Sequence, residues 1–119
     1  MQRDPKLYLN DIVAAANYIL DFTANMTFEQ YKVDVRTKSA VERQFGIIGD
    51  ATSLLSRIFP EIAVQLSNYR NVISFRNVVI HGYRDIDDEL VWQICKTRLP
   101  TLLAEVTVLL EELDAQAGS

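Results

Sequence analysis

Cysteine and histidine are nearly absent from this sequence. Its 119 residues include one cysteine, Cys95, and one histidine, His81. A single cysteine excludes an internal disulfide bond, and one residue of each kind cannot supply the His/Cys cluster of a zinc site. We therefore expect no metal ion and no cofactor. Because Cys95 lies within a helical pattern, we expect it to be a buried side chain rather than a reactive thiol.

The chain also lacks a long apolar run and an excess of positive charge. No stretch approaches the roughly 18 apolar residues of a membrane span, and the N-terminus lacks the apolar core of a signal peptide. We therefore expect a cytoplasmic protein that does not enter a membrane. Lysine and arginine total 12 against 16 acidic residues, a net charge of −4, which argues against sequence-independent coating of nucleic acid. Any contact with RNA would depend on a few local arginines, such as Arg70, Arg76 and Arg84.

The sequence does contain helical periodicity along almost its whole length. Its hydrophobic content of 49% is enough to fill one core, and apolar residues recur every three or four positions in each long segment. We predict an all-α protein, an antiparallel bundle of four to five helices in a single domain over residues 1–119. The predicted helices cover residues 5–23, a short turn from 27, residues 39–59, residues 62–81, a helix that carries 90–94 and a last helix that carries 102–113.

Capping residues set the expected helix ends. The first helix should start at Asp4-Pro5 and bury a seam that reaches Phe22. Capping boxes begin at Thr27 and at Ser39, with residues 34–38 as a polar connection between them. The later boundaries are expected at Pro60, at Gly82, at an N-cap formed by Asp87 or Asp88, and at Leu99-Pro100.

Two glycines interrupt the predicted helix over residues 39–59. Gly46 and Gly49 each cost about 1 kcal/mol relative to alanine inside a helix. Something in the folded protein should offset that cost. The close approach of another helix is the most direct explanation.

Arg76 interrupts the apolar seam of the next helix, where Tyr69, Ile73 and Ile80 are its neighbours. A guanidinium group stays charged, so this position is unfavourable unless an anion, a carboxylate or a partner chain lies opposite. One interpretation is an internal salt bridge to Asp50, with no further role. The other is a site that binds a phosphate.

Asn77, His81 and Tyr83 follow Arg76 closely. Asn77 and His81 are four residues apart, on the same face of a helix. His81 lies near the helix C-terminus, where the dipole favours a protonated imidazole suited to proton transfer. It could equally be a surface or capping residue, and Tyr83 could pack its ring over the helix end. The acidic residues 85–89 are most simply a loop and a helix cap, although such a cluster could also bind Mg²⁺, and Trp92 is expected in the core or an interface.

The segment from Arg76 to Tyr83 resembles the Arg-x4-His-x-Tyr motif of the HEPN superfamily, and in particular of HepT-like proteins that pair with a minimal nucleotidyltransferase. The resemblance extends over nearly the whole chain. Its further landmarks are residues 8–12, 40–41, 48–51, 60–62, Asp87, Trp92 and 99–100.

This resemblance implies a function and a set of roles. HepT-like proteins are toxin ribonucleases that cleave RNA without a metal ion, and a symmetric homodimer brings both motifs to one cleft. Arg76 and His81 would be catalytic, while Asn77 and Asp50 would orient the pocket or the substrate. Tyr83 would be adenylylated by the cognate nucleotidyltransferase antitoxin, which would block the cleft by charge and bulk. With one histidine per chain, an acid and a base that are both histidines would require two subunits.

The sequence departs from the family pattern in two places. The family usually has glutamate where this chain has Asp50, which shortens the reach toward Arg76. The usual Pro-Trp pair after residues 60–62 is missing, and the spacing to the motif is longer. An alternative function is a non-catalytic nucleotide-binding or regulatory subunit of a nucleotidyltransferase, which the acidity of the chain favours.

Overall fold

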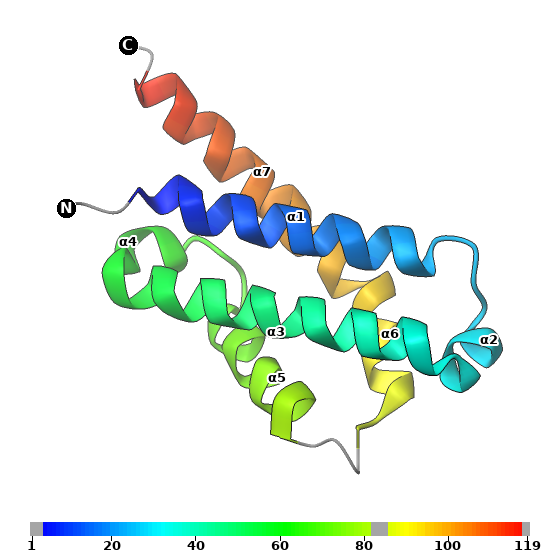
Figure 1. The fold of residues 1–119 in the computed structure, drawn as a ribbon. Helices are drawn as coiled ribbons and strands as arrows, with labels where there is room; N and C mark the ends of the chain where they lie inside the picture. The colour runs from blue at the N-terminus through cyan, green and yellow to red at the C-terminus, as the bar shows by residue number, and fades with distance from the viewer. Residues whose placement is uncertain (1–3, 82–85, 118–119) are drawn as a thin grey trace.

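The computed structural model of this chain describes residues 4–81 and 86–117, without the side chains of Val78, Ile80 and His81. All regular structure in these ranges is helical, which confirms the predicted all-α bundle (Figure 1). Two of the helices, α2 and α4, are only six and four residues long. No helix in the described ranges is long and apolar enough to cross a membrane. In chain order the helices are α1 (Pro5–Thr23), α2 (Phe28–Val33), α3 (Val35–Ile58), α4 (Pro60–Ala63), α5 (Tyr69–His81), α6 (Asp88–Lys96) and α7 (Arg98–Ala117).

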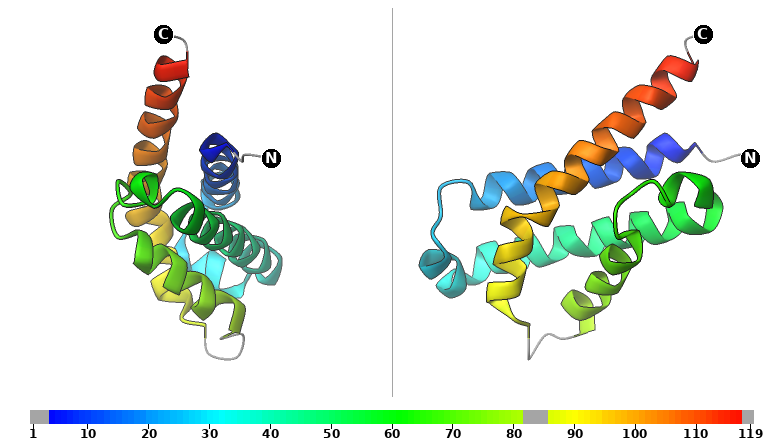
Figure 2. Two further views of the ribbon diagram at one scale, coloured as in Figure 1. Left: turned by 90° about the vertical axis from the view of Figure 1, so that its left-hand side faces the viewer. Right: turned by 180° about the vertical axis from the view of Figure 1, so that it is seen from behind.

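The centre of the bundle is the antiparallel pair α1 and α3 (Figure 1). α7 crosses α1 obliquely, and α5 packs on α3, as the two views of Figure 2 show. Apolar residues recur every three or four positions along these helices, so each helix has one apolar face. These faces meet in one core. Its largest fully buried side chains include Leu9, Ile12, Ile19, Tyr31, Val41, Ile48, Leu55, Leu66, Val91, Leu99 and Val106.

The seam predicted for α1 is wrong at its last member, Phe22. This side chain is 38% exposed and stacks on Tyr18. The buried face of α1 is rotated from the predicted seam toward Leu9 and Ala16, which are both buried. With 3.6 residues per turn, Thr23 lies on this face and Phe22 does not. The buried Thr23 hydroxyl donates to the carbonyl of Ile19 at 2.9 Å, which satisfies it inside the core.

The predicted polar connection at residues 34–38 is also wrong, because α3 begins at Val35. The capping box at Thr27 forms as expected and starts α2. Asp34 then ends α2 and caps α3, its carboxylate accepting from the Thr37 amide at 3.0 Å and from the Thr37 hydroxyl at 2.8 Å. Ser39 therefore lies inside the helix. The first turn of α3 contains few apolar residues, so hydrophobic periodicity could not reveal it.

α5 begins at Tyr69, not near residue 62 as predicted. Pro60 ends α3 as expected and starts the short α4, after which Asn68 adopts a left-handed backbone with φ 57°. Asparagine tolerates this conformation, which stops a helix from continuing. Ser67, the preceding residue, is hydrogen-bonded to a helix that is distant in the sequence. Its amide and hydroxyl donate to the Glu105 carboxylate of α7 at 3.2 and 2.5 Å.

α6 begins where predicted, but the predicted break at Leu99-Pro100 is wrong. Asp87 is the N-cap of α6, its carboxylate accepting from the Leu90 amide at 3.2 Å. The chain breaks at Thr97, and Leu99-Pro100 lies in the first turn of α7, where a proline removes no helical hydrogen bond. α7 contains the predicted residues 102–113 and runs to Ala117. The prediction of a buried Cys95 is confirmed, and burial raises the pKa of its thiol to about 12. Trp92 is half-buried against the ring of Tyr31 at 5.2 Å between centroids.

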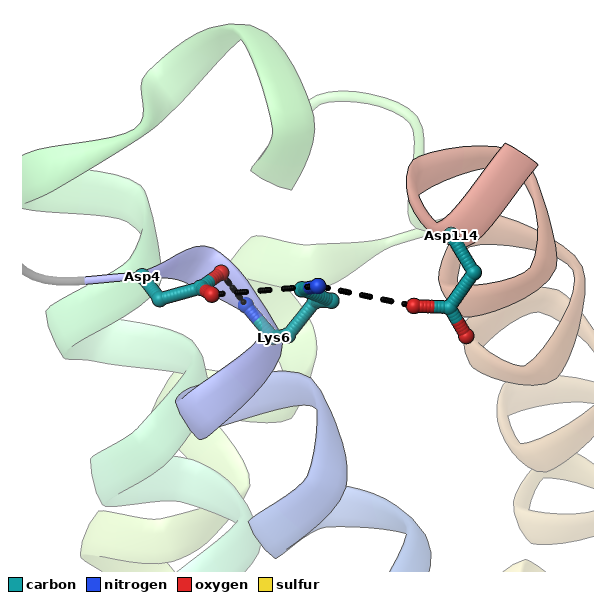
Figure 3. Close-up of polar contacts among 3 residues, drawn as sticks. All are labelled: Asp4, Lys6 and Asp114. Carbon is teal, nitrogen blue, oxygen red and sulfur yellow. Dashed lines mark hydrogen bonds and ion pairs between the residues drawn. The ribbon is translucent and has the colours of Figure 1, made fainter. Parts of the chain in front are cut away.

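The start of α1 and the end of α7 lie side by side (Figure 3). The Lys6 ammonium lies 3.5 Å from a carboxylate oxygen of Asp114 and 3.9 Å from one of Asp4. The Lys6 amide donates to Asp4, the N-cap of α1, at 2.9 Å. Both carboxylates are more than half exposed, so these ion pairs add little stability.

Candidate active site

The motif helix α5 makes its closest approach to α3 at Gly49. A β-carbon built on Gly49 would lie 2.6 Å from Cγ of Arg76 and nearer still to its Cβ. No side chain fits in that space, so only glycine lets the two helices meet here. For Gly49, the predicted close approach of another helix is confirmed. The approach places Arg76 directly over α3.

Arg76 forms an ion pair with Asp50, the residue after Gly49. The guanidinium Nε lies 2.7 Å from a carboxylate oxygen of Asp50. The Nε–H makes no hydrogen bond among the described residues, so the contact is one of charge with poor alignment. The aspartate reaches the arginine despite its short side chain, because Gly49 brings the helices together.

The pair is open to solvent on one side. The Arg76 side chain is 34% exposed and that of Asp50 is 56% exposed. An ion pair at this exposure contributes about 0–1 kcal/mol to stability. Arg76 also donates from Nη1 to the side-chain oxygen of Asn77 at 3.0 Å. Three of the five predicted site residues therefore lie together, with the guanidinium held by two neighbours and still accessible.

A groove of about 510 Å³ between α3 and α5 contains this ion pair. Its lining includes two predicted residues, Asp50 and Arg76, and two that the sequence reading missed, Ser53 and Arg57. The missed residues lie three and seven positions after Asp50, the spacing of one helix face. This helical spacing from Asp50 could have identified both residues from the sequence. The α3 wall also contains one apolar side chain, Leu54, and Ile73 of α5 completes the lining.

His81 is the last residue of α5, five positions after Arg76 in an uninterrupted helix. Its backbone is in the predicted place at the helix end. The His81 side chain and the whole of Tyr83 lie outside the described residues. Their assigned roles therefore stay predictions.

A second and larger cavity, of about 610 Å³, lies on the other side of α5, toward α6 and α7. Its floor is mainly apolar, with Phe45, Val72 and Phe75 among its residues. It contains none of the described motif residues. The motif arginine and its carboxylate partner Asp50 therefore line the α3–α5 groove and not this cavity.

The described part of the acidic segment has structural roles. Asp87 caps α6, and the Asp88 carboxylate lies 3.1 Å from the Lys38 ammonium of α3. Within residues 4–81 and 86–117, no three His, Cys, Asp or Glu side chains gather closely enough to hold a metal ion. These contacts agree with the interpretation of the segment as a helix cap. Asp85 lies outside the described residues.

The family model and the relatives that match this chain agree on one family. A family model described as "Ribonuclease HepT-like" matches residues 12–109. The chain is 32% identical to "Probable ribonuclease HepT" of Thermococcus cleftensis, over 86% of this chain and 92% of the relative. Two proteins of Methanocaldococcus jannaschii, both named "Putative RNase", are 31% and 28% identical over 90% and 97% of this chain, and over 97% and 94% of their own lengths. No solved structure gives a significant match.

Proposed function

This chain belongs to the family of HepT-like ribonucleases, and we propose that it cleaves RNA in the groove between α3 and α5. Arg76 and His81 would be the catalytic residues, and Asn77 and Asp50 would orient the guanidinium or the substrate. The observation that carries this proposal is the accessible guanidinium of Arg76, held by a half-exposed carboxylate in an open groove. Because this ion pair stabilises the fold only weakly, stability does not account for a charged residue on an apolar seam.

The chemistry of RNA cleavage fits these residue types. The 2′-hydroxyl oxygen attacks the adjacent phosphorus, the bond from phosphorus to the 5′-oxygen breaks, and a 2′,3′-cyclic phosphate and a 5′-hydroxyl result. One group must take the proton of the 2′-hydroxyl, and another must give a proton to the leaving oxygen. Histidine suits either task near neutral pH, and an arginine stabilises charge that grows on the phosphate.

The single histidine supports a homodimer as the working unit. If both the general acid and the general base are imidazoles, each chain can supply only one of them. A twofold axis would bring two copies of the motif to one cleft. Two accessible arginines would then face the same RNA strand.

Wild-type protein is expected to cleave single-stranded RNA in the presence of excess EDTA. The products should carry 2′,3′-cyclic phosphate and 5′-hydroxyl ends, which mass spectrometry distinguishes from the 3′-hydroxyl and 5′-phosphate ends of hydrolysis by an activated water. A matched oligonucleotide with 2′-deoxyribose at the cleaved position is the control and should remain intact. Cleavage of that control would contradict attack by the 2′-hydroxyl. Absence of cleavage, together with a stable complex with a nucleotidyltransferase, would favour a regulatory subunit instead.

We further propose that the protein is the toxin of a toxin–antitoxin pair, silenced by adenylylation of Tyr83. In this reaction the Tyr83 hydroxyl oxygen would attack the α-phosphorus of ATP, lose its proton and release pyrophosphate. Co-expression with the cognate minimal nucleotidyltransferase should therefore add one or more adenylate units to the intact mass and suppress RNA cleavage. The negative charge and bulk of the added adenylate would repel and occlude RNA. Tyr83→Phe is the control, because it removes the acceptor hydroxyl and keeps the ring. An equal mass increase in this variant would overturn the assignment of the modified residue.

A further inference from the structure

Arg57 lies in the same groove as Arg76 and has no role in the proposed catalytic set. It is an exposed residue in the last turn of α3, and its side chain lines the groove with Asp50 and Arg76. Seven residues separate it from Asp50 on one helix, a rise of about 10 Å. Arg57 is therefore about 10 Å along the axis of α3 from Asp50, the residue that pairs with Arg76.

The charge of Arg57 is not neutralised by any of the described residues. In the part of the chain that the structure describes, no carboxylate lies within ion-pair distance of Arg57, and its side chain makes no hydrogen bond. Asp50 already pairs with Arg76. The groove thus has two cations and one anion along its lining, a local positive charge on a protein whose net charge is −4.

Ser53 lies between the two charged positions on α3. Its side chain is small, and it lines the groove together with both arginines, Leu54 and Ile73. A single strand of nucleic acid carries regularly spaced phosphates, and arginine binds phosphate oxygens through two parallel N–H groups. The spacing of the two arginines suits two different phosphates of one strand better than a shared one.

We propose that Arg57 is a positioning residue that binds a phosphate next to the one being cleaved, and so sets how the RNA strand lies in the groove. This inference rests on the proposed ribonuclease function. A purely structural role is the alternative, since a cation in the last turn of a helix interacts favourably with the helix dipole. The two roles differ in what they change. Strand binding affects KM and its salt dependence, whereas helix stabilisation affects unfolding.

The test compares Arg57→Gln with Arg98→Gln, a control that removes the same charge from an exposed arginine at the other cavity. Arg57→Gln should raise KM for a short single-stranded RNA by about tenfold, with kcat within about twofold of wild type. The dependence of log Kd on log salt should become shallower by about 0.7. Arg57→Lys should restore part of the affinity, because it returns the charge without the paired donors. Arg98→Gln should leave all of these values unchanged.

Binding of an uncleavable RNA with 2′-deoxyribose at the scissile position separates this inference from the proposed function. If wild type cleaves RNA and Arg57→Gln binds the uncleavable strand as tightly as wild type, the inference is overturned and the ribonuclease function stands. A fall in kcat at constant KM would also overturn it, since Arg57 would then act at the scissile phosphate. If wild type does not cleave RNA but Arg57→Gln still weakens binding with a shallower salt slope, the phosphate contact stands and the ribonuclease function fails.

Discussion

Replacing Arg76 with glutamine is expected to slow RNA cleavage by about 10²–10³-fold, the usual loss when a donor to a developing charge is removed. The same change should lower the free energy of unfolding by less than about 1 kcal/mol, because the ion pair to Asp50 is half exposed. Single-turnover cleavage rates and urea unfolding measure the two effects. A large loss of cleavage rate with a small loss of stability would show that Arg76 acts in catalysis.

Arg36→Gln is the matched control for this experiment. Arg36 is an exposed arginine in the first turn of α3, 14 residues before Asp50 on the same helix, or about 21 Å away along the axis. Its replacement should change neither measurement. A variant of Arg76 that cleaves RNA at the wild-type rate but unfolds much more easily would identify the arginine as a structural residue paired with Asp50.

His81→Ala gives an independent check of the same site. Loss of a proton-transfer group is expected to slow cleavage by about 10²–10⁴-fold. The double variant with Arg76→Gln should be little slower than the worse single variant, because residues that act as a unit are not additive. Losses that multiply would indicate that the two residues act in separate steps.

Gly49→Ala is expected to destabilise the protein and to inactivate it. The added methyl group would lie 2.6 Å from Cγ of Arg76, so α5 must shift away from α3. Such overpacking costs about 1–3 kcal/mol, against a gain of about 1 kcal/mol that alanine offers inside a helix. The net loss should be up to about 2 kcal/mol, and a displacement of Arg76 by about 1 Å should slow cleavage by about 10²-fold. Thermal unfolding and cleavage rates measure both effects.

A double-mutant cycle with Arg76→Gly isolates the steric cause. Without Cβ and Cγ at position 76, the nearest remaining atom to the new methyl group is the Cα of that residue, at 3.4 Å. Gly49→Ala should then raise stability instead of lowering it, since only the helix-forming preference of alanine remains. If Gly49→Ala is already stabilising in the wild-type background, the close approach of α5 to α3 at this point is wrong.

Much of the fold could be predicted because its causes are local. Asp4-Pro5 and the capping box at Thr27 satisfy the free amides at the helix starts with side chains only a few residues away. The buried seam of α3 follows from a repeat of three and four residues. The start of α3 was missed for a reason that is also local. Asp34 and Ser39 are both acceptable caps, and the exposed first turn gives no apolar signal for choosing between them.

The start of α5 depends on contacts that sequence reasoning could not see. The left-handed Asn68 follows Ser67, whose amide and hydroxyl are held by Glu105 from α7, 38 residues later. A continuous helix through this segment satisfies the local periodicity equally well. Only the position of α7 against the turn excludes it.

For the candidate site, the sequence by itself determined that Arg76, Asn77 and His81 share one helix, that Arg76 interrupts an apolar seam, and that a family motif runs on to Tyr83. Helical spacing and hydrophobicity are enough to establish these points. Only the tertiary structure decided that Gly49 lets α5 approach α3, that Asp50 is the partner of Arg76, and that Arg57 lines the same groove. The physical reason is that these contacts join residues about 20 or more positions apart, and which faces of two helices meet is set by close packing in the whole core.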